Sequence, residues 1–140
     1  MRVLGVDHGG KRIGLALSDP SGTIANPLGV IAHISREQDV SRVLSMADEH
    51  QVRLIVVGQS FDEHGQPNLA GRRAARFAES LQRRSELAVA LWDESFSTQE
   101  ARAALIRMGT KRKQRAGHLD AQAATVILQS YLDAQAESRS

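Results

Sequence analysis

The sequence predicts an α/β fold, with a mixed five-stranded sheet and helices on both of its faces. Two observations lead to this prediction. Three strand-like segments follow one another closely at the start of the chain, and the later strand-like segments alternate with helical patterns. Strands joined by tight turns pair antiparallel, whereas strands joined through a helix run parallel. With 140 residues, the chain is expected to form a single domain over 1–140.

The first three strands are predicted from short apolar runs separated by turn residues. Residues 2–7 read as a buried strand, and 13–18 form a second strand after the glycine-rich turn 9–12. Residues 23–33 form a third strand. Pro27 places this strand at an edge of the sheet, or interrupts it, because proline cannot donate to a strand ladder.

A helix and a central strand come next. Ser35 and Gln38 have the spacing of a capping box, which predicts the start of a helix. One face of this helix is apolar, and it consists of Val40, Val43, Leu44 and Ala47. The continuous apolar run 54–58 is typical of a strand covered on both faces, and the polar segment 59–68 follows it as a loop.

The last third of the chain is mostly helical in pattern. A helix over about 69–84 precedes the strand 87–92. Ser97 begins a second capping box, whose helix ends near Gly109, and a final helix covers about 118–136.

Composition excludes several classes of protein. With 41% hydrophobic and 24% charged residues, the chain is not disordered as a whole. The absence of cysteine excludes disulfide scaffolds, zinc–thiolate sites and thiol nucleophiles, and it fits a reducing compartment. No apolar run approaches the roughly 20 residues of a membrane span. The first residues enter a strand pattern directly, so we expect a cytoplasmic protein with no membrane partner.

Positive charge is concentrated in two segments. Residues 69–84 and 107–118 together carry ten of the 18 basic residues and one of the 16 acidic ones. Their sum is +9, so the remainder of this +2 chain carries −7. Such segregation indicates a polyanionic partner, although a solvated arginine-rich helix would explain the first segment equally well. Aromatic residues are only 4%, which favours contacts to phosphates over stacking on bases.

Three carboxylates occur where a carboxylate is costly. Asp7 ends the first strand, and Glu94 follows the last one. Asp120 lies in the first turn of the final helix, on its apolar side. The later residues on the same side of this helix are Ala124, Ile127, Leu128 and Tyr131. Each acid alone has an ordinary explanation as a cap or a surface charge. Together they are expected to meet at the carboxyl edge of the sheet.

Three oxygen donors at one edge suit Mg²⁺ or Mn²⁺. His8 and His118 lie close to these acids in sequence, but we expect neither to be a ligand, and His8 is expected to point to the opposite face. Trp92 is expected to pack in the core beside this edge. An acidic metal site with basic flanks is the arrangement expected for hydrolysis of phosphodiester bonds, in which two cations activate a water and stabilise the leaving oxygen.

Three motifs resemble those of the YqgF/RuvX family, in order and over nearly the whole chain. The first is Val6-Asp7-His8-Gly9-Gly10-Lys11-Arg12-Ile13-Gly14-Leu15-Ala16-Leu17-Ser18-Asp19. The second is Asp93-Glu94-Ser95-Phe96-Ser97-Thr98. The third is Leu119-Asp120-Ala121-Gln122-Ala123-Ala124, followed by Ile127-Leu128-Gln129-Ser130-Tyr131-Leu132. The family is similar to the Holliday-junction resolvase RuvC, so the resemblance implies a ribonuclease H-like fold.

The resemblance also implies an activity and a set of site residues. It implies a bacterial nuclease that matures the 5′ end of 16S ribosomal RNA, with some members described as resolvases of DNA junctions. Asp7, Glu94 and Asp120 become the catalytic, metal-holding acids. The expected partners are pre-16S rRNA or branched DNA, and ribosomal particles, for a monomer or a homodimer. The basic residues expected to bind substrate are Lys11, Arg12, Arg72, Arg73, Arg76, Lys111, Arg112, Lys113 and Arg115.

The chain departs from the family pattern at two places. Ser95 stands where the second motif usually has arginine, and Gln59-Ser60 replaces the usual Leu-Pro after the central strand. Both changes affect the edge at which substrate would bind.

Two other classes of function remain open. The turn after Asp7 also resembles the phosphate loop of actin-like ATPases and sugar kinases, but these bind nucleotide between two such domains. The glycines do not match the dinucleotide fingerprint. A non-catalytic RNA- or ribosome-binding protein would keep the basic segments and need no metal.

Overall fold

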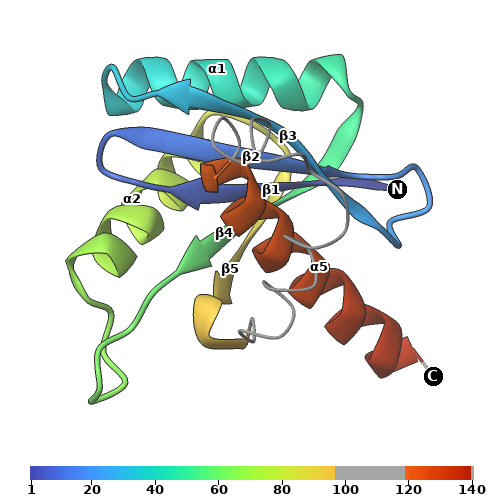
Figure 1. Ribbon diagram of the computed structural model, residues 1–140. Coiled ribbons are helices and arrows are strands. Elements are labelled where there is room, and N and C mark those ends of the chain that lie inside the picture. The colour runs from blue at the N-terminus through green and yellow to red at the C-terminus, as the bar shows by residue number, and fades with distance from the viewer. Residues whose placement is uncertain (97–118, 140) are drawn as a thin grey trace.

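The computed structural model describes residues 1–96 and 119–139. A five-stranded mixed sheet lies at its centre (Figure 1). The strands are β1 (Arg2–His8), β2 (Arg12–Ser18), β3 (Ala25–Ala32), β4 (Val52–Gln59) and β5 (Ala88–Asp93). The helices are α1 (Arg36–Glu49), α2 (Leu69–Arg83), the short 3₁₀ helix η1 (Glu94–Phe96) and α5 (Leu119–Arg139).

The strand order β3-β2-β1-β4-β5 confirms the predicted mixed sheet. β1 pairs antiparallel with β2, and β2 pairs antiparallel with β3. β4 runs parallel to both β1 and β5. The carboxyl ends of β1, β4 and β5 therefore lie at one edge of the sheet.

Strand β3 occupies an edge of the sheet, as Pro27 predicted. Its register with β2 shifts between Leu15, which pairs with Gly29, and Ala16, which pairs with Pro27. Proline has no N–H to donate at this irregularity. Because no strand lies beyond β3 in the sheet, its absence interrupts no hydrogen-bonded ladder between inner strands.

Each face of the sheet has its own apolar core. Helices α1 and α2 cover one face, where Leu4 and Val6 of β1 pack with Phe77 of α2. Helix α5 covers the other face, where Val3 of β1 and Val56 of β4 pack among its apolar residues. Figure 1 shows α5 crossing the sheet on the side away from α1 and α2. The alternation of side chains along each strand separates the two cores.

The helix starts follow the predicted capping signals where these lie in the described residues. The Ser35 hydroxyl accepts a hydrogen bond from the Gln38 N–H at 3.1 Å, and Val40, Val43 and Ala47 are fully buried. The predicted helix from Ser97 to Gly109 lies outside the described residues. In the part of the chain that is described, no helix has the length and apolar character of a membrane span.

Candidate active site at the carboxyl edge of the sheet

Asp7 lies at the carboxyl edge and faces α5. It is the penultimate residue of β1 and is partly buried. Gly5, two residues earlier, shares its face of the strand. A Cβ on Gly5 would lie 2.7 Å from the Leu128 Cβ and 3.1 Å from the Ala124 carbonyl oxygen, so this face is the one that α5 covers closely.

The Glu94 side chain folds back over β4, the strand next to the one that carries Asp7. Glu94 is the first residue after β5, and its Oε1 atom lies 3.1 Å from the position that a Cβ of Gly58 would occupy. Val6 of β1 pairs with Val57 of β4, so the residues that follow them, Asp7 and Gly58, are neighbours on adjacent strands. Glycine at 58 leaves the space in which the Glu94 carboxylate reaches toward β1.

Asp120 lies in the first turn of α5, and its side chain is outside the described residues. The predicted orientation of this helix is confirmed by the residues that follow. Ala124, Ile127 and Leu128 are at most 1% exposed, and Tyr131 is half-buried. Ile127 packs on Gly58 and Leu128 packs on Gly5, so the helix that carries Asp120 lies directly on β1, which carries Asp7, and on β4, which the Glu94 side chain contacts.

The donors brought together here suit a hard divalent cation. Asp7, near the end of β1, and Glu94, the first residue after β5, offer carboxylate oxygens on one face of the sheet. Magnesium and manganese prefer such oxygens, and partial burial favours bringing a cation to them. Within the described side chains, 1–95 and 121–138, no group of three potential ligands occurs. A third ligand would come from Asp120, whose side chain is outside the described residues.

His8 turns away from this site, as predicted. Its ring packs on Phe77 of α2 with the ring centroids 4.7 Å apart, on the face opposite to α5. Burial lowers the pKa of His8 from its ordinary value of 6.5, against a smaller opposing effect of the Asp39 charge. The imidazole is therefore not placed to share a cation with Asp7.

The predicted basic residues in the described segments form a surface near the same edge. Lys11 and Arg12 are exposed where the turn after β1 enters β2, and Arg72, Arg73 and Arg76 are exposed on α2. The two groups meet, because the Arg73 Nη1 atom lies 3.7 Å from the position of a Cβ on Gly10. Lys111, Arg112, Lys113 and Arg115 lie outside the described residues, as does His118.

One of the two departures from the family pattern has a clear structural role. Gln59 donates from Nε2 to the Gly71 carbonyl oxygen at 3.2 Å, and the Ser60 hydroxyl lies 2.7 Å from Asn68 Oδ1. These contacts join the end of β4 to the start of α2. At the other departure, the Ser95 backbone N–H donates to Asp93 Oδ1 at 2.8 Å and closes the turn in which Glu94 lies. Arginine would make the same backbone contact, so this bond does not explain the serine.

Trp92 confirms its predicted packing role beside the edge. Its ring contacts Tyr131 of α5 edge-on, with centroids 5.2 Å apart. The indole N–H donates to the Ser130 hydroxyl at 3.1 Å. The contact joins β5 to α5 immediately before Glu94.

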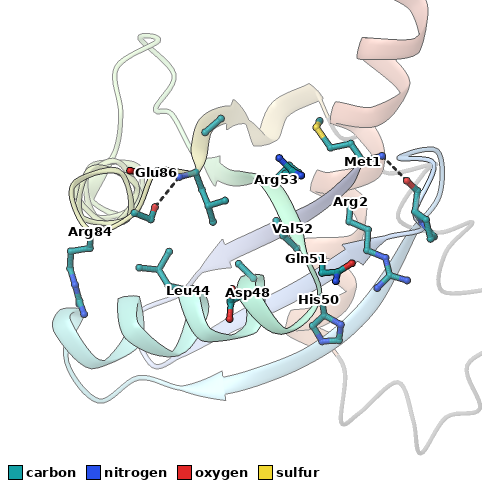
Figure 2. A pocket seen from close by; sticks show the side chains of 15 residues that line it. Met1, Arg2, Leu44, Asp48, His50, Gln51, Val52, Arg53, Arg84 and Glu86 are labelled. Carbon is teal, nitrogen blue, oxygen red and sulfur yellow. Dashed lines mark hydrogen bonds between the residues drawn. The ribbon is translucent and has the colours of Figure 1, made fainter.

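A hollow lies at the opposite edge of the sheet, away from the acids (Figure 2). It is lined by residues where β1, β4 and β5 begin and where α1 ends, among them Arg2, Asp48, Arg53 and Glu86. Both basic and acidic side chains line it, so it lacks the single sign of charge that a polyanion would need.

Sequence reasoning missed a buried acid, Asp39, in the first turn of α1. Asp39 is fully buried and receives hydrogen bonds from the Ile34 N–H at 3.1 Å, from Arg42 Nη2 at 2.8 Å, and from the His33 ring. The signal was present in the sequence. Asp39 precedes buried Val43 by four residues and Ala47 by eight, which is the same spacing that singled out Asp120.

The strand order of the mixed sheet and the helices on its two faces define a ribonuclease H-like fold. Solved structures support this fold: Thermus thermophilus RuvC in complex with a Holliday junction substrate matches with a TM-score of 0.70 and 17% identity, over 99% of this chain and 97% of that chain. The chain belongs to the RuvX family, whose model, described as "Holliday junction resolvase", matches residues 1–134.

Other relatives agree with this assignment. A protein of Thermoanaerobacter pseudethanolicus is 39% identical over 136 residues, covering 96% of this chain and 98% of its own length. One from Anaeromyxobacter is 41% identical over 133 residues, covering 95% and 97%. Both are named "Putative pre-16S rRNA nuclease". The fold alone is shared with the fowlpox virus resolvase, solved with Holliday junction DNA, which has a TM-score of 0.62 at 13% identity, over 96% of this chain and 99% of that chain.

Proposed function

We propose that this chain is a divalent-metal-dependent nuclease that hydrolyses phosphodiester bonds in the 5′ extension of pre-16S rRNA. The observation that carries the proposal is the placement of the Glu94 carboxylate over Gly58, beside Asp7. Family membership and the names of the two relatives support the same class of reaction.

The three acids have one shared role in this proposal. Asp7, Glu94 and Asp120 would hold Mg²⁺ or Mn²⁺. A metal bound there would act as a Lewis acid that activates water and stabilises the leaving oxygen. The close packing of α5 on Gly5 and Gly58 supports this role, because acids held by well-packed elements would need little reorganisation when substrate binds.

The basic surface binds the rest of the substrate backbone. Lys11 and Arg12 lie at the same edge as the acids, and Arg73 extends that surface onto α2. Arginine and lysine contacts to phosphates position a strand without reading its sequence. Arg72, Arg76 and the basic segment 111–115 would lengthen the bound stretch.

The competing substrate is a four-way DNA junction, which the family model's description and the RuvC likeness suggest. We therefore propose incubating the full chain with 5′-extended 16S precursor and with a four-way junction, each with and without Mn²⁺. Metal-dependent cleavage of the precursor is expected. Cleavage of the junction alone would contradict the RNA assignment, and binding of the precursor without cleavage would indicate a non-catalytic RNA-binding protein.

The proposed basic surface predicts how salt affects binding. Replacing Arg73 by alanine should weaken RNA binding and reduce the slope of log affinity against log salt by about one, because one phosphate contact is lost. Arg83→Ala is the matched control on the same helix, since Arg83 already forms an ion pair with Glu79. Both are measured by fluorescence anisotropy over a range of salt concentrations. Equal slopes for wild type and Arg73→Ala would remove Arg73 from the interface.

A further inference from the structure

His33 presents a hydrogen-bonding atom at the edge of the sheet where substrate is proposed to bind. It follows the last residue of β3, and its side chain is 40% exposed. Its Nδ1 atom is hydrogen-bonded to Asp39, which is fully buried. This bond fixes the orientation of the ring.

Asp39 acts as a carboxylate, and therefore as an acceptor only. Burial on its own would raise the pKa of Asp39, but hydrogen bonds from His33, the Ile34 N–H and Arg42 together lower it below 3.8. Arg42 also donates to the Ala32 carbonyl oxygen, so it joins the end of β3 to α1. Asp39 and Arg42 therefore hold the buried side of the His33 ring in place.

The Asp39 carboxylate determines which ring nitrogen of His33 carries a hydrogen. Since an ionised carboxylate cannot donate, His33 Nδ1 must be the donor. In a neutral imidazole the other nitrogen, Nε2, is then an acceptor. Nε2 lies on the far side of the ring from Asp39, and no hydrogen bond to it occurs among the described residues.

His33 lies beside the basic pair that is proposed to contact substrate. Its backbone N–H donates to the Lys11 carbonyl oxygen at 2.9 Å, and Ala32, the residue before it, pairs with Arg12. Strand β3 lies two strands from β1, which corresponds to roughly 10 Å from the strand that carries Asp7. Ile31, two residues earlier, packs in the core under α1 and α2, so the His33 ring lies on that face of the sheet, opposite to Asp7. A nucleic acid strand that crosses the basic surface between Lys11 and Arg73 would pass close to His33.

We propose that His33 Nε2 accepts a hydrogen bond from a ribose 2′-hydroxyl of the substrate and so favours RNA over DNA. A phosphate oxygen only accepts hydrogen bonds, so it cannot pair with a neutral Nε2, whereas the 2′-hydroxyl can donate. The inference rests on the proposed nuclease function, and it adds a residue that distinguishes the two candidate substrates.

Binding of matched single strands tests the proposal. Wild type and His33→Phe are titrated with an RNA strand and with DNA of the same sequence, at pH 8 with EDTA to prevent cleavage. Loss of one hydrogen bond should weaken RNA binding about three- to tenfold and leave DNA binding unchanged. A wild type without preference for RNA, or an equal loss on both strands, would overturn the proposal.

Two further variants separate recognition from a purely structural role. His33→Ala should lose the same preference for RNA, and circular dichroism checks that each variant is folded. His50→Phe, at the opposite edge of the sheet, should bind both strands as wild type does. A structural role alone would lower both affinities together. If wild type prefers RNA through His33 but never cleaves it, only the nuclease proposal is refuted. If wild type cleaves RNA and the His33 variants keep the wild-type ratio of RNA affinity to DNA affinity, only this inference is refuted.

Discussion

Replacement of Asp7 by asparagine should lower the rate of RNA cleavage at least about a thousandfold, because the loss of one metal-binding carboxylate removes several kcal/mol of transition-state stabilisation. RNA binding in the absence of metal should remain, since phosphate contacts come from the basic surface. Cleavage is followed on labelled precursor in Mn²⁺, and binding is followed separately in EDTA.

A matched control distinguishes loss of the site from loss of an acid in general. Asp48 is exposed at the opposite edge, so Asp48→Asn should cleave at the wild-type rate. Glu94→Gln and Asp120→Asn should resemble Asp7→Asn. If Asp7→Asn lost binding and cleavage together, the catalytic assignment would have no support.

Gly58→Ala should have the second largest effect, on both stability and activity. The new Cβ would lie 2.6 Å from Ile127 Cδ1 and 3.1 Å from Glu94 Oε1. Relief of this overlap requires the Ile127 side chain, the Glu94 side chain or α5 to move, at a cost of about 1–3 kcal/mol in the free energy of unfolding. Displacement of Glu94 should also slow cleavage.

Gly29 provides the control for this change. It lies in edge strand β3, with no atom within 4 Å of its Cβ position. Gly29→Ala should change the free energy of unfolding by no more than about 0.5 kcal/mol and leave cleavage unaltered. Urea unfolding measures both variants. A Gly58→Ala protein that unfolds and cleaves like wild type would contradict the close packing of Glu94 over β4.

The two glycines connect the architecture of the sheet to its chemistry. Gly5 allows the backbone of α5 to approach β1, and Gly58 allows an acid from beyond β5 to reach across β4. Both lie on the face of the sheet that carries Asp7. The candidate site therefore depends on these two glycines as much as on the carboxylates themselves.

Much of the fold was predictable from local pattern. Apolar runs located the five strands to within a few residues, because a strand covered on both faces needs a continuous apolar segment. The Ser35 cap placed the start of α1, and Pro27 placed β3 at an edge. The way in which consecutive strands are joined, by turns or by helices, then predicted the mixed sheet.

The candidate site was predictable only in part. Asp7 and Glu94 could be placed at one edge, since parallel strands end there together. The same rule for acids on an apolar helix face singled out Asp120 but applies equally to Asp39. Asp39 is instead held by His33 and Arg42, two partners whose positions depend on how β3 packs against α1.

The sequence alone determined the order of the elements, the two apolar faces of the sheet and the concentration of positive charge, because these follow from spacing and composition along the chain. Only the tertiary structure decided that Glu94 lies over Gly58 beside Asp7, that His8 turns toward Phe77, and that Asp39 holds His33 at the surface. These contacts join residues far apart in the chain or in separate elements, and they depend on strand register and close packing, which local patterns do not encode.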